Sequence, residues 1–138
     1  MLLKINVWIS WNGYKQGAYS GISFPYTALQ PSIKTKAVYN NIQDVYRELL
    51  KLSVDAEEKG FNVGESLYMQ SFHFVDHSLL VDKECQTRIK EYQFCKNFAV
   101  APYPSLYQTP AHIIDDFMTI DEEFNACIAR KNKEKQNA

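Results

Sequence analysis

A strand-like stretch that ends at Asn12-Gly13 constrains the possible folds of this chain more than any other feature. Between residues 3 and 9 the odd positions are aliphatic and the even positions are polar or aromatic, the period of two expected for a half-buried strand. Asn-Gly tolerates the positive φ values of a type I′ turn and is a strong hairpin signal. We therefore expect a β-hairpin in which Trp11 faces Tyr14 and the aliphatic row points into the core.

The predicted hairpin explains part of the high aromatic content of residues 8–26. In this register Gly17 lies opposite Trp8 and leaves room for the indole ring. Trp8, Tyr19 and Tyr26 then project from the face opposite the aliphatic row. They either lie beneath helices or form an exposed aromatic patch, and the usual burial of large aromatic residues favours the first arrangement.

Helical periodicity begins after a proline-bounded connecting loop at 27–35. Residues 41–59 carry apolar side chains at steps of three and four, the pattern of an amphipathic helix. Asn41 and Asp44 form a plausible capping pair at its start, and Gly60 supplies a stop. A helix over 41–59 is therefore predicted, with a mixed-charge face toward solvent.

A third strand and a second helix are expected next. The segment 66–75 is rich in aromatic and β-favouring residues, which predicts a strand that joins the hairpin. Helical spacing returns over 82–98, although 79–81 can also be a strand. The apolar positions of that helix are Cys85, Ile89, Tyr92, either Cys95 or Lys96, and Phe98.

The last part of the chain predicts more helix. Pro110 suits a first helical turn and opens either two helices, 110–118 and 120–132, or one kinked helix. A frayed lysine-rich tail follows at 129–138. The expected fold is a single α+β domain over 1–138, in the order β-β-α-β-α-α, with three to four helices packed on one face of a small antiparallel sheet.

Composition predicts a cytoplasmic protein. Fifteen basic residues against 16 acidic residues give a formal charge of −1, so no overall field attracts nucleic acid or anionic lipid. The sequence has no apolar run of the roughly 18 to 20 residues needed to cross a bilayer. Its 3 cysteines are an odd set without CxxC spacing, which suits a reducing compartment.

The best candidate for catalysis is a metal site at His73, Asp76 and His77. Two imidazoles and a carboxylate within five residues are donors that zinc and related ions accept, and a metal-dependent hydrolase or nuclease is the alternative function they suggest. A structural role for these residues is favoured, because the sequence does not indicate further ligands. No cofactor is predicted, and the lack of a P-loop, HExxH or GxSxG motif favours a protein that is not an enzyme.

Two other kinds of chemistry are weaker alternatives. A nucleophilic cysteine would need a lowered pKa, whereas Cys85, Cys95 and Cys127 fall on or near apolar helix faces. Single-stranded nucleic acid could stack on aromatic residues of an open sheet. That face would comprise Trp8, Tyr19, Tyr68 and Phe72.

Binding to another protein is the function favoured by the sequence. Trp11, Tyr14, Tyr103 and Tyr107 lie in predicted turns or proline-bounded loops, where folding does not require large aromatic residues. With Asp115 and Asp116, these loops could cover a basic surface on a partner. A small inhibitor of the immunity-protein or anti-defence type would act in this way, and an uncovered hairpin edge also allows a homodimer.

Overall fold

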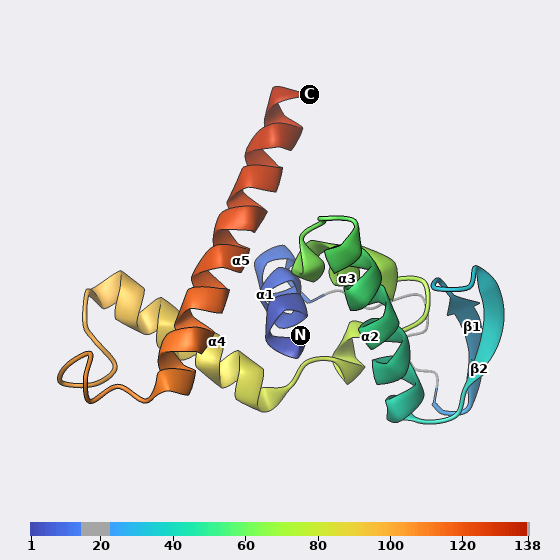
Figure 1. Ribbon diagram of the computed structural model, residues 1–138, viewed down its shortest axis with the longest axis horizontal. Helices are drawn as coiled ribbons and strands as arrows, with labels where there is room; N and C mark the ends of the chain where they lie inside the picture. Colours follow the sequence, from blue (N-terminus) through green and yellow to red (C-terminus); the bar gives the residue numbers. More distant parts are fainter. Residues whose placement is uncertain (15–22, 138) are drawn as a thin grey trace.

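The computed structural model describes residues 1–14 and 23–137. These residues form a mixed α+β structure with a two-stranded antiparallel sheet and five α-helices (Figure 1). The predicted α+β class is therefore confirmed, whereas the three strands, the helix count and the order β-β-α-β-α-α are wrong. In chain order the elements are α1 (Leu2–Asn12), β1 (Tyr26–Gln30), β2 (Thr35–Tyr39), α2 (Ile42–Glu58), α3 (Val63–Ser71), the 3-10 helix η1 (His77–Leu79), α4 (Lys83–Phe98) and α5 (Ala111–Gln136).

Helix α1 replaces the predicted first strand. Ile5, Asn6, Val7, Trp8 and Ile9 are all buried, so the odd and even positions both face the interior. A helix that is buried on every side has an apolar sequence without a polar face, and over a short run it cannot be distinguished from a strand. Helices α3, α4 and α5 contact α1 and cover it.

Gly13 ends α1 instead of forming a hairpin turn. Its φ of 76° is the positive value expected for glycine, but here it follows the last helical residue, and its N–H donates to the carbonyl of Ser10. The side chain of Asn12 turns back and donates to the carbonyl of Trp8 at 2.9 Å. The predicted hairpin is therefore wrong at its turn, and the predicted partners Gly17 and Tyr19 lie outside the described residues.

Strand β1 lies largely in the segment 27–35 predicted to be a loop, and β2 begins at the last residue of that segment. Strands β1 and β2 pair from Tyr26 opposite Tyr39 to Gln30 opposite Thr35. The rings of Tyr26 and Tyr39 stack at 5.3 Å, and Tyr39 stacks on Phe74 at 5.6 Å. Aromatic packing from a distant segment thus holds this hairpin against the helices.

Helices α2 and α3 each begin after an asparagine N-cap. The predicted helix over 41–59 is confirmed as α2, with Asn41 accepting from the N–H of Asp44. The predicted strand over 66–75 is wrong, because α3 occupies most of it. Asn62 accepts from the N–H of Glu65 at 2.7 Å and starts that helix.

Helices α4 and α5 are in contact and cross each other in Figure 1. The helix predicted over 82–98 is confirmed as α4, and Asp82 caps it by accepting from the N–H groups of Glu84 and Cys85. Residues 111–136 form one continuous helix, so the division into two helices is wrong and the tail predicted to fray is helical through Gln136.

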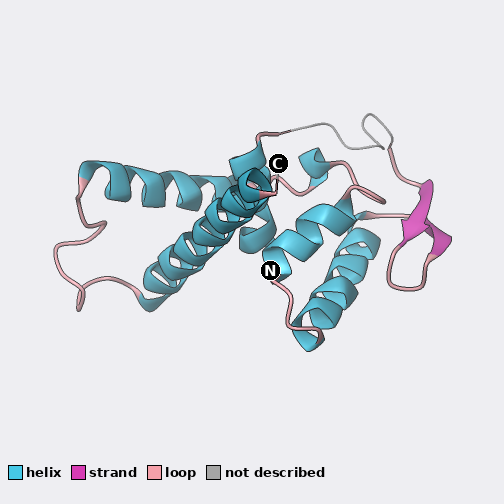
Figure 2. Ribbon diagram, turned by 90° about the horizontal axis from the view of Figure 1, so that it is seen from above, coloured by secondary structure: helices cyan, strands magenta, loops and turns pink. Residues whose placement is uncertain are grey.

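The elements are arranged around α1. In Figure 1 this helix lies near the centre of the molecule, with the β1–β2 hairpin at one end and the loop between α4 and α5 at the other. Figure 2 shows the same separation from above. The larger core cluster joins α1, α2, α3 and the sheet, and a smaller cluster around Ile89, Tyr92 and Ile120 joins α1 to α4 and α5.

Candidate interaction surface

The end of the molecule opposite the sheet exposes many large apolar side chains. We define the α4–α5 arm as residues 90–118, which comprise the second half of α4, the loop 99–110 and the first turns of α5. Its loop extends away from the rest of the fold in both views (Figures 1 and 2). The exposed members are Phe94, Phe98 (66%), Val100, Tyr103, Leu106 (68%), Tyr107 (98%) and Met118 (58%).

The loop of the arm has its own hydrogen bonds. Ala99 ends α4 in the left-handed conformation with φ 52°, and the N–H of Val100 returns to the carbonyl of Cys95. The hydroxyl of Thr109 donates to the carbonyl of Ser105 at 2.7 Å, which closes a turn just before Pro110. These bonds define the loop although nearly all of its side chains face solvent.

A groove of about 460 Å³ lies between this loop and α5. Leu106 lines it from the loop, and Phe117 and Met118 line it from α5. Among the described residues that line it, Asp121 alone is charged. The remaining lining residues are Ala101, Pro102, Ser105, Thr109, Ile113 and Ile114.

A second groove, of about 550 Å³, lies on the α4 side of the same loop. Tyr103 and Phe94 contribute apolar surface to it, while Arg88, Lys90 and Glu91 make its lining mixed in charge. The guanidinium of Arg88, just before the arm, pairs with two acids of the arm, at 2.8 Å from Glu91 and 3.0 Å from Asp116. The groove toward α5 is therefore the more apolar of the two.

The first half of α5 is acidic, whereas the loop before it carries no charged side chain. Between residues 97 and 129 the sequence contains no Lys or Arg. Asp116 pairs with Arg88, and the buried Glu123 accepts from Nε1 of Trp8 at 2.8 Å. Asp115, Asp121 and Glu122, the other acids of this stretch, are exposed.

Asp121 also anchors the arm to the fold. Its carboxylate accepts from the hydroxyl of Tyr92 at 2.6 Å. Burial, and then this hydrogen bond, raise the pKa of Tyr92 to about 12, so the phenol stays protonated and remains the donor. One oxygen of Asp121, a residue that lines the groove, thus joins α5 to α4.

The predicted contact residues fall into two separate groups. Tyr103, Tyr107, Asp115 and Asp116 are all in the α4–α5 arm. Trp11 instead packs on the middle of α5, with its ring 5.9 Å from Phe124. At 1.5 Å per residue, Phe124 is about 20 Å along the helix from the loop.

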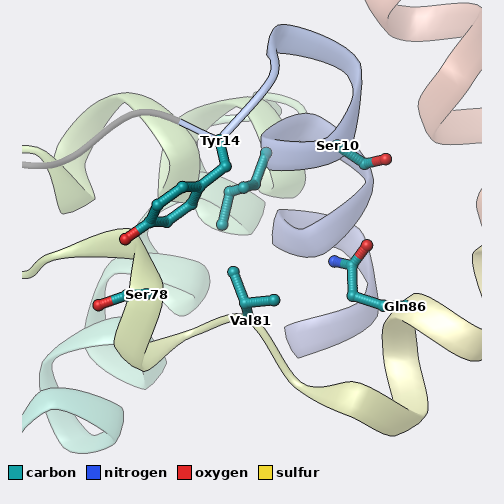
Figure 3. A pocket seen from close by; sticks show the side chains of 6 residues that line it. Ser10, Tyr14, Ser78, Val81 and Gln86 are labelled. Atoms are coloured by element: carbon teal, nitrogen blue, oxygen red, sulfur yellow. The ribbon is translucent and has the colours of Figure 1, made fainter.

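Tyr14 lies near a third hollow, of about 530 Å³. Together with Tyr14, it is lined by Ile9 and Ser10 of α1 and by Ser78 and Val81 (Figure 3). The hydroxyl of Tyr14 donates to Oδ1 of Asp76 at 3.1 Å. Tyr14 is therefore held to the segment that precedes η1, away from the arm.

His73, Asp76 and His77, the alternative metal site, have a structural arrangement. His77 is buried, and its Nε2 lies 2.7 Å from the hydroxyl of Ser71, whereas His73 is exposed. Burial lowers the pKa of His77, although the nearby Asp76 opposes the shift. Within residues 1–14 and 23–137, no three His, Cys, Asp or Glu side chains are placed to hold a metal ion.

The residues proposed to stack bases are mostly inside the protein. Trp8 and Tyr68 are buried and stack on each other at 6.2 Å between ring centroids, and Tyr19 lies outside the described residues. Burial raises the pKa of Cys127 to about 12 and also raises that of Cys85, the opposite of what activates a cysteine nucleophile. Neither alternative gains support from this arrangement.

Sequence analysis missed several members of the exposed apolar set. Helical spacing predicts that Phe98 is buried, whereas it is exposed, and the predicted contact residues do not include the exposed Phe94. Phe94 does not share the spacing of Ile89 and Tyr92, which was the available signal that it faces outward. Leu106 lies in the same proline-bounded loop as Tyr103 and could have been chosen with it.

Comparison with known proteins adds no relative. No protein-family model matches the chain, and no curated protein or solved structure matches it. In the described part of the chain, none of the helices has both the length and the apolar character needed to span a bilayer. The cytoplasmic location stays a prediction, and function has to follow from the surfaces described above.

Proposed function

We propose that this protein acts by binding another protein, without catalysis, and that the α4–α5 arm is its contact surface. The observation that carries the proposal is the concentration of large exposed apolar side chains on one projecting end of the fold. Soluble monomers rarely expose large contiguous apolar patches, and those that do generally use them for binding. Tyrosine, phenylalanine and methionine, which the arm exposes, are enriched in protein interfaces.

An inhibitory role suits the same surface. The arm combines apolar side chains with exposed acids such as Asp115, so it can cover an apolar and basic site on an enzyme. A small inhibitor of the immunity-protein or anti-defence type would work by this kind of coverage alone. Trp11 and Tyr14 are the other predicted contacts, and their distance from the arm makes them a separate, testable group.

The test is to capture a partner from native cytosol, identify it, and measure its affinity with both proteins purified. Leu106→Ser/Tyr107→Ser removes exposed apolar surface from the arm. The matched control is Leu50→Ser/Phe61→Ser, which removes exposed apolar surface from the opposite part of the molecule. Trp11→Ala/Tyr14→Ala tests the second predicted group.

We expect the arm variant to weaken binding at least tenfold and the control to bind as the parent does. Loss of a few central contacts typically accounts for changes of this size in an interface. Equal affinity of the arm variant and the parent would reject the arm as the contact surface. If only the Trp11/Tyr14 variant lost binding, the interface would lie at the end of α1.

A further inference from the structure

We infer that the groove between the loop and α5 accepts an apolar segment of a partner protein whose flanking residues are Lys or Arg. The inference rests on the proposed function, since it specifies what the α4–α5 arm binds. The groove would contact the apolar side chains of the segment. An acidic rim, formed by Asp115 and Glu122, would attract its basic side chains.

The floor and walls of the groove favour apolar side chains. Leu106 on the loop and Met118 on α5 are more than half exposed although both line the groove. Covering these side chains removes apolar surface from water, which stabilises a complex by roughly 25 cal/mol per Å² before the costs of association. The volume of about 460 Å³ lies within the roughly 300–1,000 Å³ typical of binding clefts.

The open form of the groove favours a chain segment over an enclosed small molecule. Tyr107 beside it is 98% exposed, so the loop does not close over the groove. Small-molecule sites commonly surround about 70–90% of a ligand, which requires walls on most sides. A helix or extended segment that lies along α5 needs only one such face.

The acidic rim favours an occupant of positive charge. Ile114, Met118 and Asp121 are spaced by four and three residues and line the groove from one face of α5. Asp115 and Glu122 lie three residues before and four residues after Met118, so they flank the same face, and both are exposed. No Lys or Arg occurs between residues 97 and 129 to offset these acids.

Charge complementarity therefore selects a basic partner. Unlike charges across an interface increase the association rate and discriminate among partners, whereas an acidic segment would be repelled. Because Asp115 and Glu122 are exposed, their attraction should weaken as salt increases. Asp121 already accepts the hydrogen bond of Tyr92, so it is left unchanged in the test.

The experiment uses two fluorescein-labelled helical peptides with the same leucine stripe. One carries Lys and the other Glu at every flanking position, and binding to the full chain is followed by fluorescence anisotropy. Asp115→Asn/Glu122→Gln neutralises the rim. The matched control, Glu57→Gln/Glu58→Gln, makes the same change in net charge at exposed positions near the end of α2.

We expect the Lys peptide to bind at least tenfold more tightly than the Glu peptide at low salt. The rim variant should reduce this preference to less than threefold, and the α2 control should retain it. Met118→Ser and Leu106→Ser should each weaken binding of the Lys peptide at least fivefold. Thermal melting of every variant establishes that the comparison is made between folded proteins.

Several outcomes would overturn the inference. Equal binding of the two peptides, no binding of the Lys peptide, or a preference that survives in the rim variant would each reject a basic occupant. Sedimentation of the parent provides a further outcome: a dimer that Leu106→Ser dissociates would make a second copy the occupant. The proposed function would survive these results, since it fails only if arm variants leave binding of the captured partner unchanged.

Discussion

The aromatic residues around α1 and those of the α4–α5 arm have opposite environments in the same chain. Trp8 is fully buried, stacks on Tyr68 and donates its N–H to Glu123. Tyr107 in the arm is 98% exposed, and Phe98 at the end of α4 is 66% exposed. Aromatic composition alone therefore does not identify a binding surface, because the rings around α1 are buried and those of the arm are exposed.

The polar groups show the same contrast. In the interior Asn6 donates to the carbonyls of Leu2 and Leu80 and accepts from Gln86, and among the described residues no buried side-chain N or O atom lacks a partner. Such fully bonded interiors specify one structure and tolerate little change. Substitutions near Trp8 should therefore alter stability, and substitutions in the arm should alter binding.

The largest effect is expected at Trp8. Trp8→Ala removes the buried indole ring and should lower the free energy of unfolding by about 3–5 kcal/mol, measured by urea denaturation. The substitution also leaves the carboxylate of Glu123 without the N–H that it accepts. A loss below about 1 kcal/mol would show that the ring is not packed as described.

Trp8→Phe separates the loss of the buried ring from the loss of the hydrogen bond to Glu123. Phenylalanine keeps most of the apolar volume but cannot donate to Glu123, so a loss of about 1–3 kcal/mol is expected for the unsatisfied carboxylate. Trp8→Phe/Glu123→Gln should recover part of that loss, because an uncharged amide costs less to bury unpaired. No recovery would mean that the hydrogen bond contributes little.

Gly64→Ala is expected to destabilise the same cluster. A Cβ at this position in α3 would lie 2.8 Å from the Trp8 ring and would overlap Oε2 of Glu123. In an ordinary helix interior this change is favourable by about 1 kcal/mol. Here overpacking should reverse the sign and cost about 1–3 kcal/mol in urea denaturation, and an unchanged or increased stability would contradict the close approach of α1 to α3.

How far the sequence predicts the structure also differs between regions. Helix α2 was predicted to within one residue at each end, because its apolar stripe and the Asn41 cap are encoded locally. Helix α1 was predicted as a strand, because its burial on all sides depends on α3 and α5, which lie far along the chain. A short apolar run does not contain that information.

The candidate surface was predicted in part for similar reasons. Prolines 102 and 104 mark an extended loop, and both Tyr103 and Tyr107 are exposed in it. Helical spacing placed Phe98 with the buried residues, but α4 continues past its packed stripe at Ile89 and Tyr92. Periodicity shows which residues share a face and does not show where the neighbouring helix stops covering it.

A moderate, pH-dependent effect is expected at His77. Because burial lowers its pKa in the folded state below the ordinary 6.5, the unfolded chain binds more protons just below that pH. The contribution of His77 to stability is therefore complete above pH 6.5 and declines as the pH falls toward the lower folded-state value. Between about pH 7.5 and 5.5, the parent should lose free energy of unfolding.

Substitution assigns that loss to one side chain. His77→Gln should be less stable at neutral pH, because the contact with Ser71 is disturbed, and should show a flatter dependence on pH. The same exchange at the exposed His73 is the matched control. If His77→Gln retained the full slope of the parent, another group would be responsible for it.

The smallest change in stability is expected in the arm. Leu106→Ser/Tyr107→Ser removes side chains that are 68% and 98% exposed and should change the free energy of unfolding by no more than about 0.5 kcal/mol per site. The same variant is expected to lose binding. Substitutions in the arm would then affect binding without affecting stability, whereas substitution of Trp8 lowers stability. A loss of several kcal/mol would instead show that these side chains pack on the fold in solution, and the exposed surface on which both proposals depend would not exist.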